Sequence, residues 1–249
     1  MSLYIITHKN FECKINAKGY KTIQVGAYKG HISADCFDDW GDNISAKNAN
    51  YCELTGLYWL WKNTKDSYIG ISHYRRYFTH DINARNALSS SEVETLLQKY
   101  DIILPFHAKY NKTIEDDYCE ISGKKEDLIK VGEIIKNKYP DYYDDYELYL
   151  RGNKGTLYNM MITSKDNYDK YCSWLFDILF ELEKNVDLEQ YNDYQKRIYG
   201  FLAERLLNVW VIHNHMKTCE IGIIPTEEKR TFVIKLLTGL KRSILYKLL

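Results

Sequence analysis

The stretch "YIGISHYRRYF" (68–78) joins a run of β-forming residues directly to the cationic cluster "HYRR" (73–76). The chain has eight arginines, and two of them are adjacent here. Guanidinium groups bind phosphate oxygens through paired hydrogen bonds and stay charged at physiological pH. At the end of a strand, His73, Arg75 and Arg76 therefore predict a diphosphate site. The alternative is structural, with both arginines paired to carboxylates and the histidine satisfied in the core, and the motif alone leaves both open.

Predicted strands alternate with predicted helices around this stretch, and no linker interrupts residues 1–225. Such alternation favours a single α/β domain with a mainly parallel central sheet covered by helices. These sheets bind ligands beyond the carboxyl ends of their strands, which places Thr7–Lys9 and His73–Arg76 on one edge. The expected strands are 3–7, 22–27, 68–72, 101–105, 156–164 and 220–225, and the expected helices are 46–63, 92–99, 125–138, a long one containing 168–179, and about 193–215.

Three helix ends carry recognisable signals. Ser45 is placed to cap the first expected helix, and Ser91 with Glu94 resembles a capping box at the start of the second. Pro140 is expected to end the third helix, because proline cannot continue the hydrogen-bond ladder.

The bulk composition narrows the class of protein. Lys+Arg and Asp+Glu both number 34, so the formal net charge is zero and a nucleic-acid partner is not expected. The mean hydropathy is −0.47. No apolar run approaches the length of about 18 residues that a transmembrane helix needs, and the N-terminus lacks a signal peptide. We therefore expect a cytoplasmic chain.

Cysteine and tyrosine usage add two further expectations. The six cysteines are scattered without a C-x-x-C pair, which predicts reduced side chains rather than a disulfide or a metal site. The 23 tyrosines suit the walls of a polar cleft that stacks against sugars. An AT-rich coding sequence is the alternative explanation for them, and it is the favoured one.

Several catalytic motifs are absent from the sequence. It contains no G-x-x-x-x-G-K-[ST], G-x-G-x-x-G, H-E-x-x-H or G-x-S-x-G, so it gives no support for a P-loop NTPase, a dinucleotide fold, a zincin or an α/β-hydrolase. His213 and His215 would lie on different faces of a helix and are not expected to share a metal. No Asp-x-Asp occurs, although many nucleotide-sugar transferases hold a divalent ion with it. The cations of 73–76 can neutralise a leaving diphosphate instead, so we expect no required metal cofactor, while a divalent ion remains compatible.

Four blocks of the chain stand out, in the order "GDNISAKNANYCELTGLYWLWKN" (41–63), "YIGISHYRRYF" (68–78), "YNMMITSKDNYDKYCSWLFDIL" (158–179) and "YQKRIYGFLAERLLNVW" (194–210). Together they resemble a family that occurs in bacterial capsule and exopolysaccharide gene clusters, was long filed as an uncharacterised domain, and is now grouped with glycosyltransferases. Some of its members look like galactofuranosyltransferases that use UDP-galactofuranose. The resemblance covers about residues 3–215 and implies a GT-A-like fold that transfers a sugar from a nucleoside diphosphate.

The resemblance implies roles for residues on the donor side. Thr7, His8 and Lys9 leave the first strand where a GT-A-like fold cradles the nucleobase and ribose, although an ordinary strand-to-loop junction is the alternative. Asn159 and Met160, within the strand 156–164, are expected either to touch the donor sugar or to belong to the core.

The turn-rich segment "DDWGDNIS" (38–45) offers further polar side chains. We expect Asp42 and Asn43 to hydrogen-bond the nucleoside, whereas Ser45 is expected to cap the following helix. Capping by all three residues is the alternative.

Inverting glycosyl transfer, which the family implies, needs a carboxylate that takes the proton from the acceptor hydroxyl. Glu204 is the first candidate and Asp193 the second. Glu204 shares one stripe of the helix 193–215 with Arg197, Gly200 and Asn208. A glycine inside a helix costs about 1 kcal/mol relative to alanine, which indicates close approach of a ligand or a neighbouring backbone. The alternative is a solvated face with routine surface contacts.

These inferences predict a glycosyltransferase of bacterial capsular, exopolysaccharide or O-antigen biosynthesis. It is expected to transfer a hexose, with galactofuranose favoured, from a UDP-sugar to a polyprenyl-diphosphate-linked glycan. A non-catalytic sugar-nucleotide-binding or glycan-binding protein of the same fold is one alternative. A scaffold of the polysaccharide assembly complex is another.

The C-terminal segment "KRTFVIKLLTGLKRSILYKLL" (229–249) combines six basic residues and many apolar side chains with no acidic residue. This composition predicts a basic amphipathic helix over 226–249 that lies on an anionic leaflet. The chain would then be peripherally associated with the inner face of the plasma membrane. A helix docked on the domain's own core or on a second subunit is the alternative.

Overall fold

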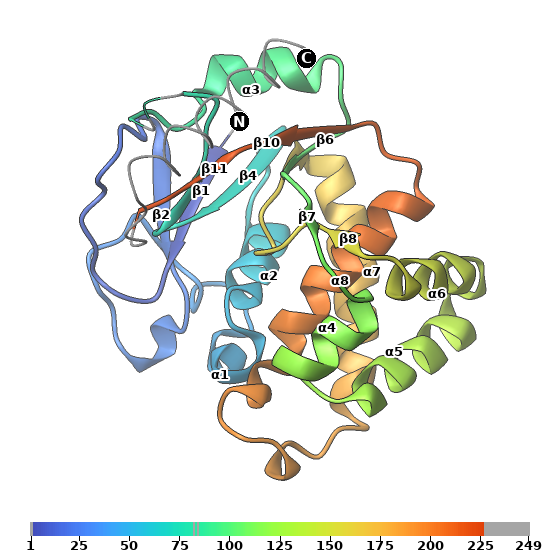
Figure 1. The fold of residues 1–249 in the computed structure, drawn as a ribbon. Coiled ribbons are helices and arrows are strands. Elements are labelled where there is room, and N and C mark those ends of the chain that lie inside the picture. Colours follow the sequence, from blue (N-terminus) through green and yellow to red (C-terminus); the bar gives the residue numbers. More distant parts are fainter. Residues whose placement is uncertain (1, 82, 84, 227–249) are drawn as a thin grey trace.

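The structure is a computed structural model that describes residues 2–81, 83 and 85–226 (Figure 1). The predicted C-terminal helix, beyond Thr226, lies outside the described residues. The strands are β1 Ser2–Thr7, β2 Tyr20–Gln24, β3 Cys36–Phe37, β4 Tyr68–His73, β5 Arg76–Phe78, β6 Ile102–Pro105, β7 Ala108–Lys109, β8 Lys154–Gly155, β9 Ile162–Ser164, β10 Thr218–Ile221 and β11 Ile223–Pro225. The α-helices are α1 Asn48–Tyr51, α2 Leu54–Asn63, α3 Ser90–Leu97, α4 Ile114–Ile121, α5 Lys125–Lys138, α6 Tyr143–Arg151, α7 Lys165–Glu183 and α8 Ile198–His213.

The strands build one large mixed sheet and one small one. The main path of the large sheet is β10-β6-β9-β4-β1-β2-β3, and β5 links β4 to β11. β4, β1, β2 and β3 run parallel, as do β6 and β10, whereas β9 is antiparallel to both of its neighbours. The small sheet pairs β7 with β8. The predicted α/β architecture with a mainly parallel central sheet is therefore confirmed.

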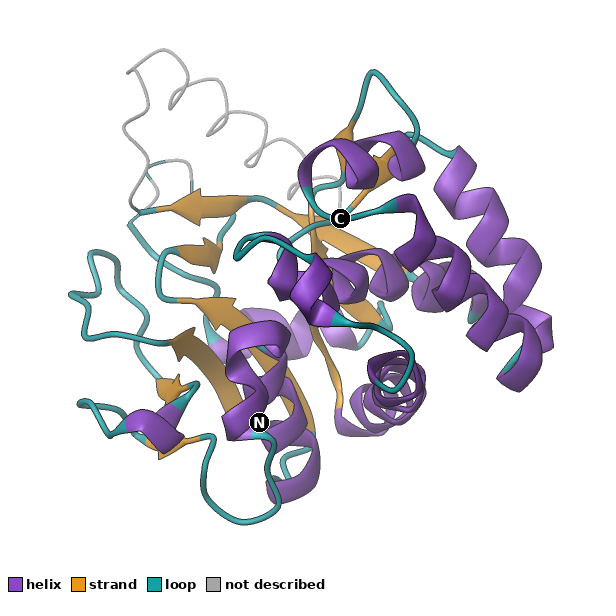
Figure 2. Cartoon of the chain, turned by 90° about the horizontal axis from the view of Figure 1, so that it is seen from below, coloured by secondary structure: helices purple, strands orange, loops and turns teal. Residues whose placement is uncertain are grey.

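The central strand β1 is buried on both faces, which explains its unbroken run of apolar residues. Tyr4 and Ile6 face the larger core, which α2, α7 and α8 share, while Leu3 and Ile5 face the other side of the sheet. Val93 of α3 packs with Leu3 on that second side. The turned view shows most helices gathered on one side of the strands (Figure 2). No helix in the described part of the chain is both long and apolar enough to cross a bilayer.

The helix expected over 46–63 is broken, and this is the first correction. Cys52 has a positive φ of 53°, so α1 ends before it and α2 begins two residues later. Ser45 does not cap a helix: its hydroxyl donates to Asp38, which is fully buried, and accepts from the backbone N–H of Tyr28. The regular spacing of apolar residues predicted one continuous helix, because α1 and α2 bury the same face.

The second helix is correctly located but begins earlier than expected. The capping box consists of Ser89 and Glu92, and α3 starts at Ser90. The predicted box of Ser91 and Glu94 has the same spacing but lies inside the first turn. α5 ends at Lys138 before Pro140, as predicted.

Two expected strands are shorter than the apolar runs that suggested them. Only the last three residues of 156–164 form β9, because Tyr158 and Asn159 adopt positive φ angles of 80° and 47°. The run 220–225 divides into β10 and β11, which pair with different neighbours. The bend at 158–159 and the break between β10 and β11 both change the direction of the chain near the edge where β4 ends.

A buried carboxylate joins three segments beneath that edge. Asp127 is fully buried and accepts hydrogen bonds from the Tyr118 hydroxyl at 2.9 Å, the Lys124 backbone N–H at 2.8 Å and the Tyr191 hydroxyl. These donors belong to α4, to the start of α5 and to the loop that leads into α8. A buried carboxylate with several donors stabilises a fold only while all of them are present.

We predict that Asp127→Ala lowers the free energy of unfolding by about 3 kcal/mol, because it leaves buried tyrosine hydroxyls without an acceptor. Urea denaturation followed by circular dichroism measures this change. Glu126→Ala, at an exposed neighbouring position of the same helix, is the control and should change stability by less than about 0.5 kcal/mol. Equal losses in the two variants would contradict the role of the buried network.

Candidate active site

The carboxyl ends of β1 and β4 meet at one edge of the sheet. Ile6 of β1 pairs with His73 of β4, and the backbone N–H of Tyr74 donates to the Ile6 carbonyl at 3.0 Å. Thr7 and His8 therefore leave the sheet beside the turn that carries Arg75. The structure thus brings together the two segments that the sequence placed on one edge.

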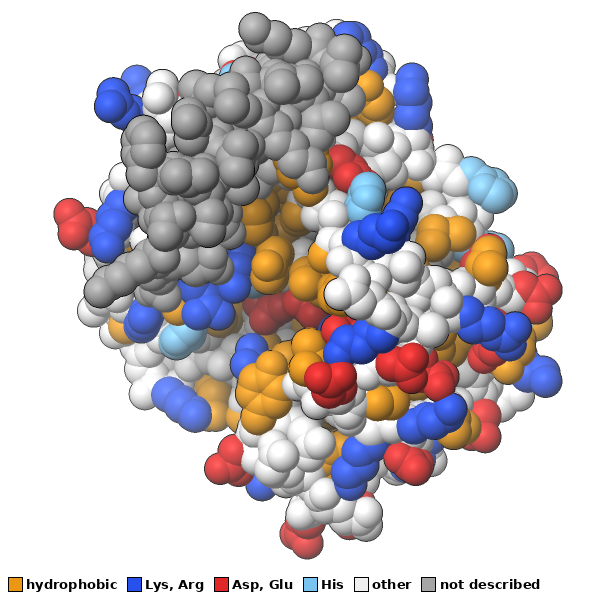
Figure 3. Space-filling view, in the orientation of Figure 1, with side chains coloured by type: hydrophobic (Ala, Val, Ile, Leu, Met, Phe, Trp, Pro, Cys, Tyr) orange, Lys and Arg blue, Asp and Glu red, His pale blue; other side chains and the backbone are white. Residues whose placement is uncertain are grey.

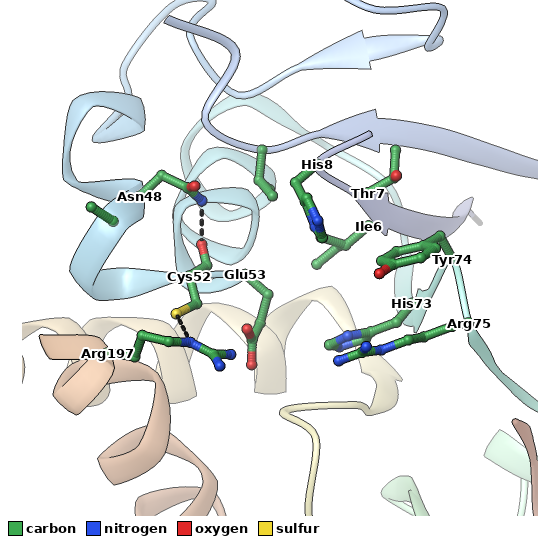
Figure 4. Close-up of a pocket in the computed structure, with 12 residues that line it drawn as sticks. Ile6, Thr7, His8, Asn48, Cys52, Glu53, His73, Tyr74, Arg75 and Arg197 are labelled. Atoms are coloured by element: carbon green, nitrogen blue, oxygen red, sulfur yellow. Dashed lines mark hydrogen bonds between the residues drawn. The ribbon is translucent and has the colours of Figure 1, made fainter. Parts of the chain in front are cut away.

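A cavity of about 390 Å³ opens at this edge. The space-filling view shows a hollow near the centre of the face, with acidic side chains at its floor and basic side chains beside it (Figure 3). Its lining comes from the exits of β1 and β4, from the break between α1 and α2, and from the residue before α8 (Figure 4). The polar lining residues are Thr7, His8, Asn48, Cys52, Glu53, His73, Tyr74, Arg75 and Arg197.

One side of the site is cationic. The Tyr74 ring lies 5.3 Å from the His8 ring, 4.9 Å from the Lys9 ammonium and 5.7 Å from the Arg75 guanidinium carbon, measured to ring centroids. We call His8, Lys9, Tyr74 and Arg75 the cationic wall; His8, Tyr74 and Arg75 line the cavity, and Lys9 lies next to them over the Tyr74 ring. Aromatic rings attract cations to their faces, so Tyr74 helps to hold these groups together.

Arg76 points away from the cationic wall. The chain turns sharply after His73, which pairs with Arg76 in antiparallel β5. The guanidinium carbon of Arg76 lies 4.2 Å from the centroid of the Tyr158 ring. Because neighbouring residues at such a turn point to different sides, only Arg75 of the predicted arginine pair lines the cavity.

Glu53 lies at the break between α1 and α2, across the cavity from Arg75 (Figure 4). Its Oε1 accepts a hydrogen bond of 2.7 Å from Nδ2 of Asn159, which also donates to the Gly200 carbonyl at 3.0 Å. Among the described residues, no hydrogen bond holds the second oxygen of Glu53. This side chain is therefore both positioned and available to a ligand.

Glu204 lies behind the cavity and is not part of its lining. Its Oε1 accepts from the Tyr158 backbone N–H at 2.8 Å, and its Oε2 accepts from Arg205 at 2.9 Å. Burial raises the pKa of Glu204, Arg205 opposes this, and the negative charge of Glu53 adds to it. The alternative prediction, that this helix face is solvated, is wrong, because Asn208 and Arg205 are both buried.

His73 separates the cationic wall from the two carboxylates. Burial lowers its pKa, Glu53 opposes this, and Arg76 and Arg75 lower the pKa further. The imidazole is therefore neutral at pH 7. Its Nε2 is buried and has no hydrogen-bond partner among the described residues, a state that is uncommon for buried polar atoms of folded proteins.

Unusual backbone conformations cluster at this site. Cys52, Tyr158 and Asn159 are three of the four non-glycine residues with positive φ in the described part of the chain. Such conformations cost of order 1–3 kcal/mol each and persist where the surroundings enforce them. They position Glu53 and turn the fully buried Asn159 toward it, and Asn159 keeps a buried Oδ1 without a partner in that part.

Gly200 of α8 lies against the break between α1 and α2. A Cβ at this position would lie 3.4 Å from Cβ of Cys52 and 3.7 Å from the Tyr51 carbonyl oxygen. These are ordinary van der Waals distances, so this packing would accept a Cβ and does not require the close approach expected from the sequence.

Besides Arg76 and Glu204, three more sequence-predicted residues do not line the cavity. Asp42 accepts from the Tyr58 hydroxyl at 3.1 Å, and Asn43 donates to backbone carbonyls of its own loop. The Asp193 side chain is fully exposed, 3.5 Å from Lys196. Met160 is fully buried in the core, in agreement with the second of its two expected roles.

Sequence reasoning missed Glu53, Cys52 and Asn48, and it considered Arg197 only as part of a helix stripe. The available signal was a carboxylate inside an apolar block, "CELTGLYWLW" (52–61), where a continuous helix would have buried it. Within the described ranges, no group of three or more His, Cys, Asp or Glu residues could hold a metal ion.

Comparisons with known proteins place the chain in a family. A family described as "Domain of unknown function (DUF4422)" matches residues 2–215. No curated protein sequence matches the chain. The apo structure of the bifunctional glycosyltransferase WbbM is similar, with a TM-score of 0.81 and 28% identity over 91% of this chain. The match covers 45% of that protein, so this chain spans less than half of its length. The fold is GT-A-like, and the extent of the family match shows that the chain belongs to the DUF4422 family.

Proposed function

We propose that this chain is a glycosyltransferase that transfers a hexose from a UDP-sugar. The observation that carries the proposal is a single cavity in which a cationic wall faces a positioned carboxylate. Such a site can neutralise a leaving diphosphate and activate an acceptor hydroxyl in the same space. The similarity of the chain to a glycosyltransferase structure supports this reading.

Arg75 and Lys9 of the cationic wall are proposed to bind the diphosphate of the donor. Arg75 offers a forked set of donors and Lys9 a compact charge, and both lie beside the Tyr74 ring. Thr7 and His8, at the exit of β1, are proposed to bind the nucleoside, because such sheets bind ligands beyond the carboxyl ends of their strands. In this arrangement a divalent ion is not required, because fixed cations supply the positive charge.

Glu53 is proposed as the general base, in place of the sequence-predicted Glu204. Glu53 lines the cavity with one oxygen uncommitted, whereas Glu204 already accepts hydrogen bonds on both oxygens. In the transfer, the carboxylate takes the proton of the acceptor hydroxyl as that oxygen bonds to the anomeric carbon. The bond from this carbon to the diphosphate oxygen breaks, and its electron pair leaves with UDP. Glu204 acts as a positioning residue that holds the Tyr158 backbone.

The finer identity of the substrates rests on the sequence. The resemblance of the four blocks supports galactofuranose as the sugar, inversion at the anomeric carbon and a polyprenyl-diphosphate-linked acceptor. The basic and apolar composition of 229–249 supports contact with an anionic membrane that would hold such an acceptor.

Arg75→Ala is predicted to weaken UDP binding about 10- to 100-fold, because a forked, charge-assisted contact to phosphate is lost. Isothermal titration calorimetry with UDP measures the effect. Arg151→Ala removes an exposed arginine of α6 that pairs with Glu147, and it serves as the control with unchanged affinity.

Two outcomes of this titration would count against the proposal. Equal affinities of wild type and Arg75→Ala would exclude the cationic wall as the diphosphate site. A wild-type chain that binds no UDP at all would favour the scaffold alternative over any sugar-nucleotide protein.

Glu53→Gln is predicted to lower kcat about 10²- to 10⁴-fold while leaving UDP affinity within about twofold, because only the proton acceptor is lost. The assay follows UDP release from UDP-galactofuranose with a polyprenyl-diphosphate-linked galactoside as acceptor. Glu133→Gln, on the exposed face of α5, is the control.

A larger loss of kcat in folded Glu204→Gln than in Glu53→Gln would return the base assignment to Glu204. UDP binding without turnover in the wild type, with any UDP-hexose offered, would instead support the non-catalytic binding protein.

A further inference from the structure

Arg197 lines the cavity on the side opposite Arg75, and two aromatic rings outside the lining lie next to its guanidinium group. Arg197 and Arg75 lie on opposite sides of Glu53 (Figure 4). Nε of Arg197 donates to the Cys52 sulfur at 3.2 Å, which fixes the side chain against the break before α2. Nδ2 of Asn50 donates to the carbonyl of Lys196, the residue before Arg197, at 2.9 Å and ties this turn to α1.

Two rings continue this side beyond Arg197. The Tyr194 and Phe201 rings lie 5.0 Å apart, and the Arg197 guanidinium carbon is 5.7 Å and 5.2 Å from their centroids. Tyr194 is 52% exposed, so much of its ring surface is open to solvent beside Arg197. An exposed ring offers its face to the C–H groups of a sugar, while the guanidinium offers donors to its hydroxyls.

The chemistry of inversion decides which substrate this side faces. In an inverting displacement, the attacking oxygen and the leaving group lie on opposite faces of the sugar ring. If the leaving diphosphate is on the cationic wall, the acceptor oxygen must approach from the side of Arg197. Glu53 stands between the two sides, where a base must reach the proton of that oxygen.

We propose that Arg197, Tyr194 and Phe201 form the acceptor subsite and that they bind a hexose ring at the end of the acceptor glycan. This inference rests on the proposed function and adds to it the location and chemical class of the second substrate. The ring stacks on Tyr194, its hydroxyls accept hydrogen bonds from Arg197, and one hydroxyl is directed to Glu53. In the transfer step, that hydroxyl gives its proton to Glu53 and its oxygen bonds to the anomeric carbon as UDP departs.

The test uses simple glycosides as acceptor probes. Saturation-transfer NMR is recorded on the full chain with saturating UDP and, in turn, the methyl glycosides of galactose, glucose, mannose, rhamnose and N-acetylglucosamine. At least one glycoside is expected to bind the wild type. Tyr194→Ala should weaken that binding by about fivefold or more, as loss of a stacking ring does, with UDP affinity within about twofold.

Matched variants separate stacking from a general surface effect. Tyr28→Ala removes another exposed tyrosine, 44% accessible, whose ring lies beside Lys29 and not beside Arg197, and it should leave glycoside binding unchanged. Arg197→Ala should weaken the glycoside and spare UDP, whereas Arg75→Ala should weaken UDP. Folding of each variant is checked by its urea midpoint.

Three results would overturn the proposal. One is unchanged glycoside binding in Tyr194→Ala, and another is a loss of UDP affinity in Arg197→Ala as large as that in Arg75→Ala, which would place Arg197 on the donor. The third is a wild type that binds UDP but none of the five glycosides, which removes the acceptor subsite alone. A wild type that binds no UDP would remove the proposed function, and the subsite with it.

Discussion

The parallel pairing of β1 with β4 is the constraint on which the site depends. It sets Ile6 opposite His73, so two polar segments that are distant in sequence leave the sheet side by side. After His73 the chain turns sharply into antiparallel β5. This turn directs Arg75 into the cavity and Arg76 toward Tyr158. Strand order thus determines which cation can meet a ligand.

The carboxylates of Glu53 and Glu204 are held by backbone as much as by side chains. The positive φ of Cys52 ends α1, and those of Tyr158 and Asn159 shorten β9. These bends let the Asn159 amide donate to Glu53 and the Tyr158 N–H donate to Glu204. A bend that costs free energy locally is retained here because it positions charge next to the ligand space.

Cationic, neutral and anionic side chains follow one another in space across the site. The cationic wall is followed by neutral His73, then by Glu53 and Glu204, and finally by buried Arg205, which is 3.4 Å from Asp117. Burial raises the pKa of Glu204, while its contact with Arg205 limits the rise. The charge of Arg205 therefore balances that of Glu204, and Glu53 is the carboxylate that faces the cavity.

Periodicity and strand signals located the main strands and helices of the α/β domain and the shared edge of Thr7 and His73, but they did not predict α4, α6 or the short strands β3, β5, β7 and β8. Arg75 could be predicted because a strand followed by cations is a local pattern. Glu53 could not, since its role depends on a helix break at Cys52 and on an amide from a segment about a hundred residues later. Asp42 was assigned to the ligand because turn residues carry polar groups whether they bind a ligand or their own loop.

A crystal structure of the chain with UDP, grown in the presence of EDTA, tests the central claim most directly. The account predicts the diphosphate within hydrogen-bond distance of Arg75 and Lys9, the nucleoside beside Thr7, and no metal ion between phosphate and protein. A diphosphate bound on the Arg197 side of Glu53, or one that binds only when a divalent ion is restored, would contradict it.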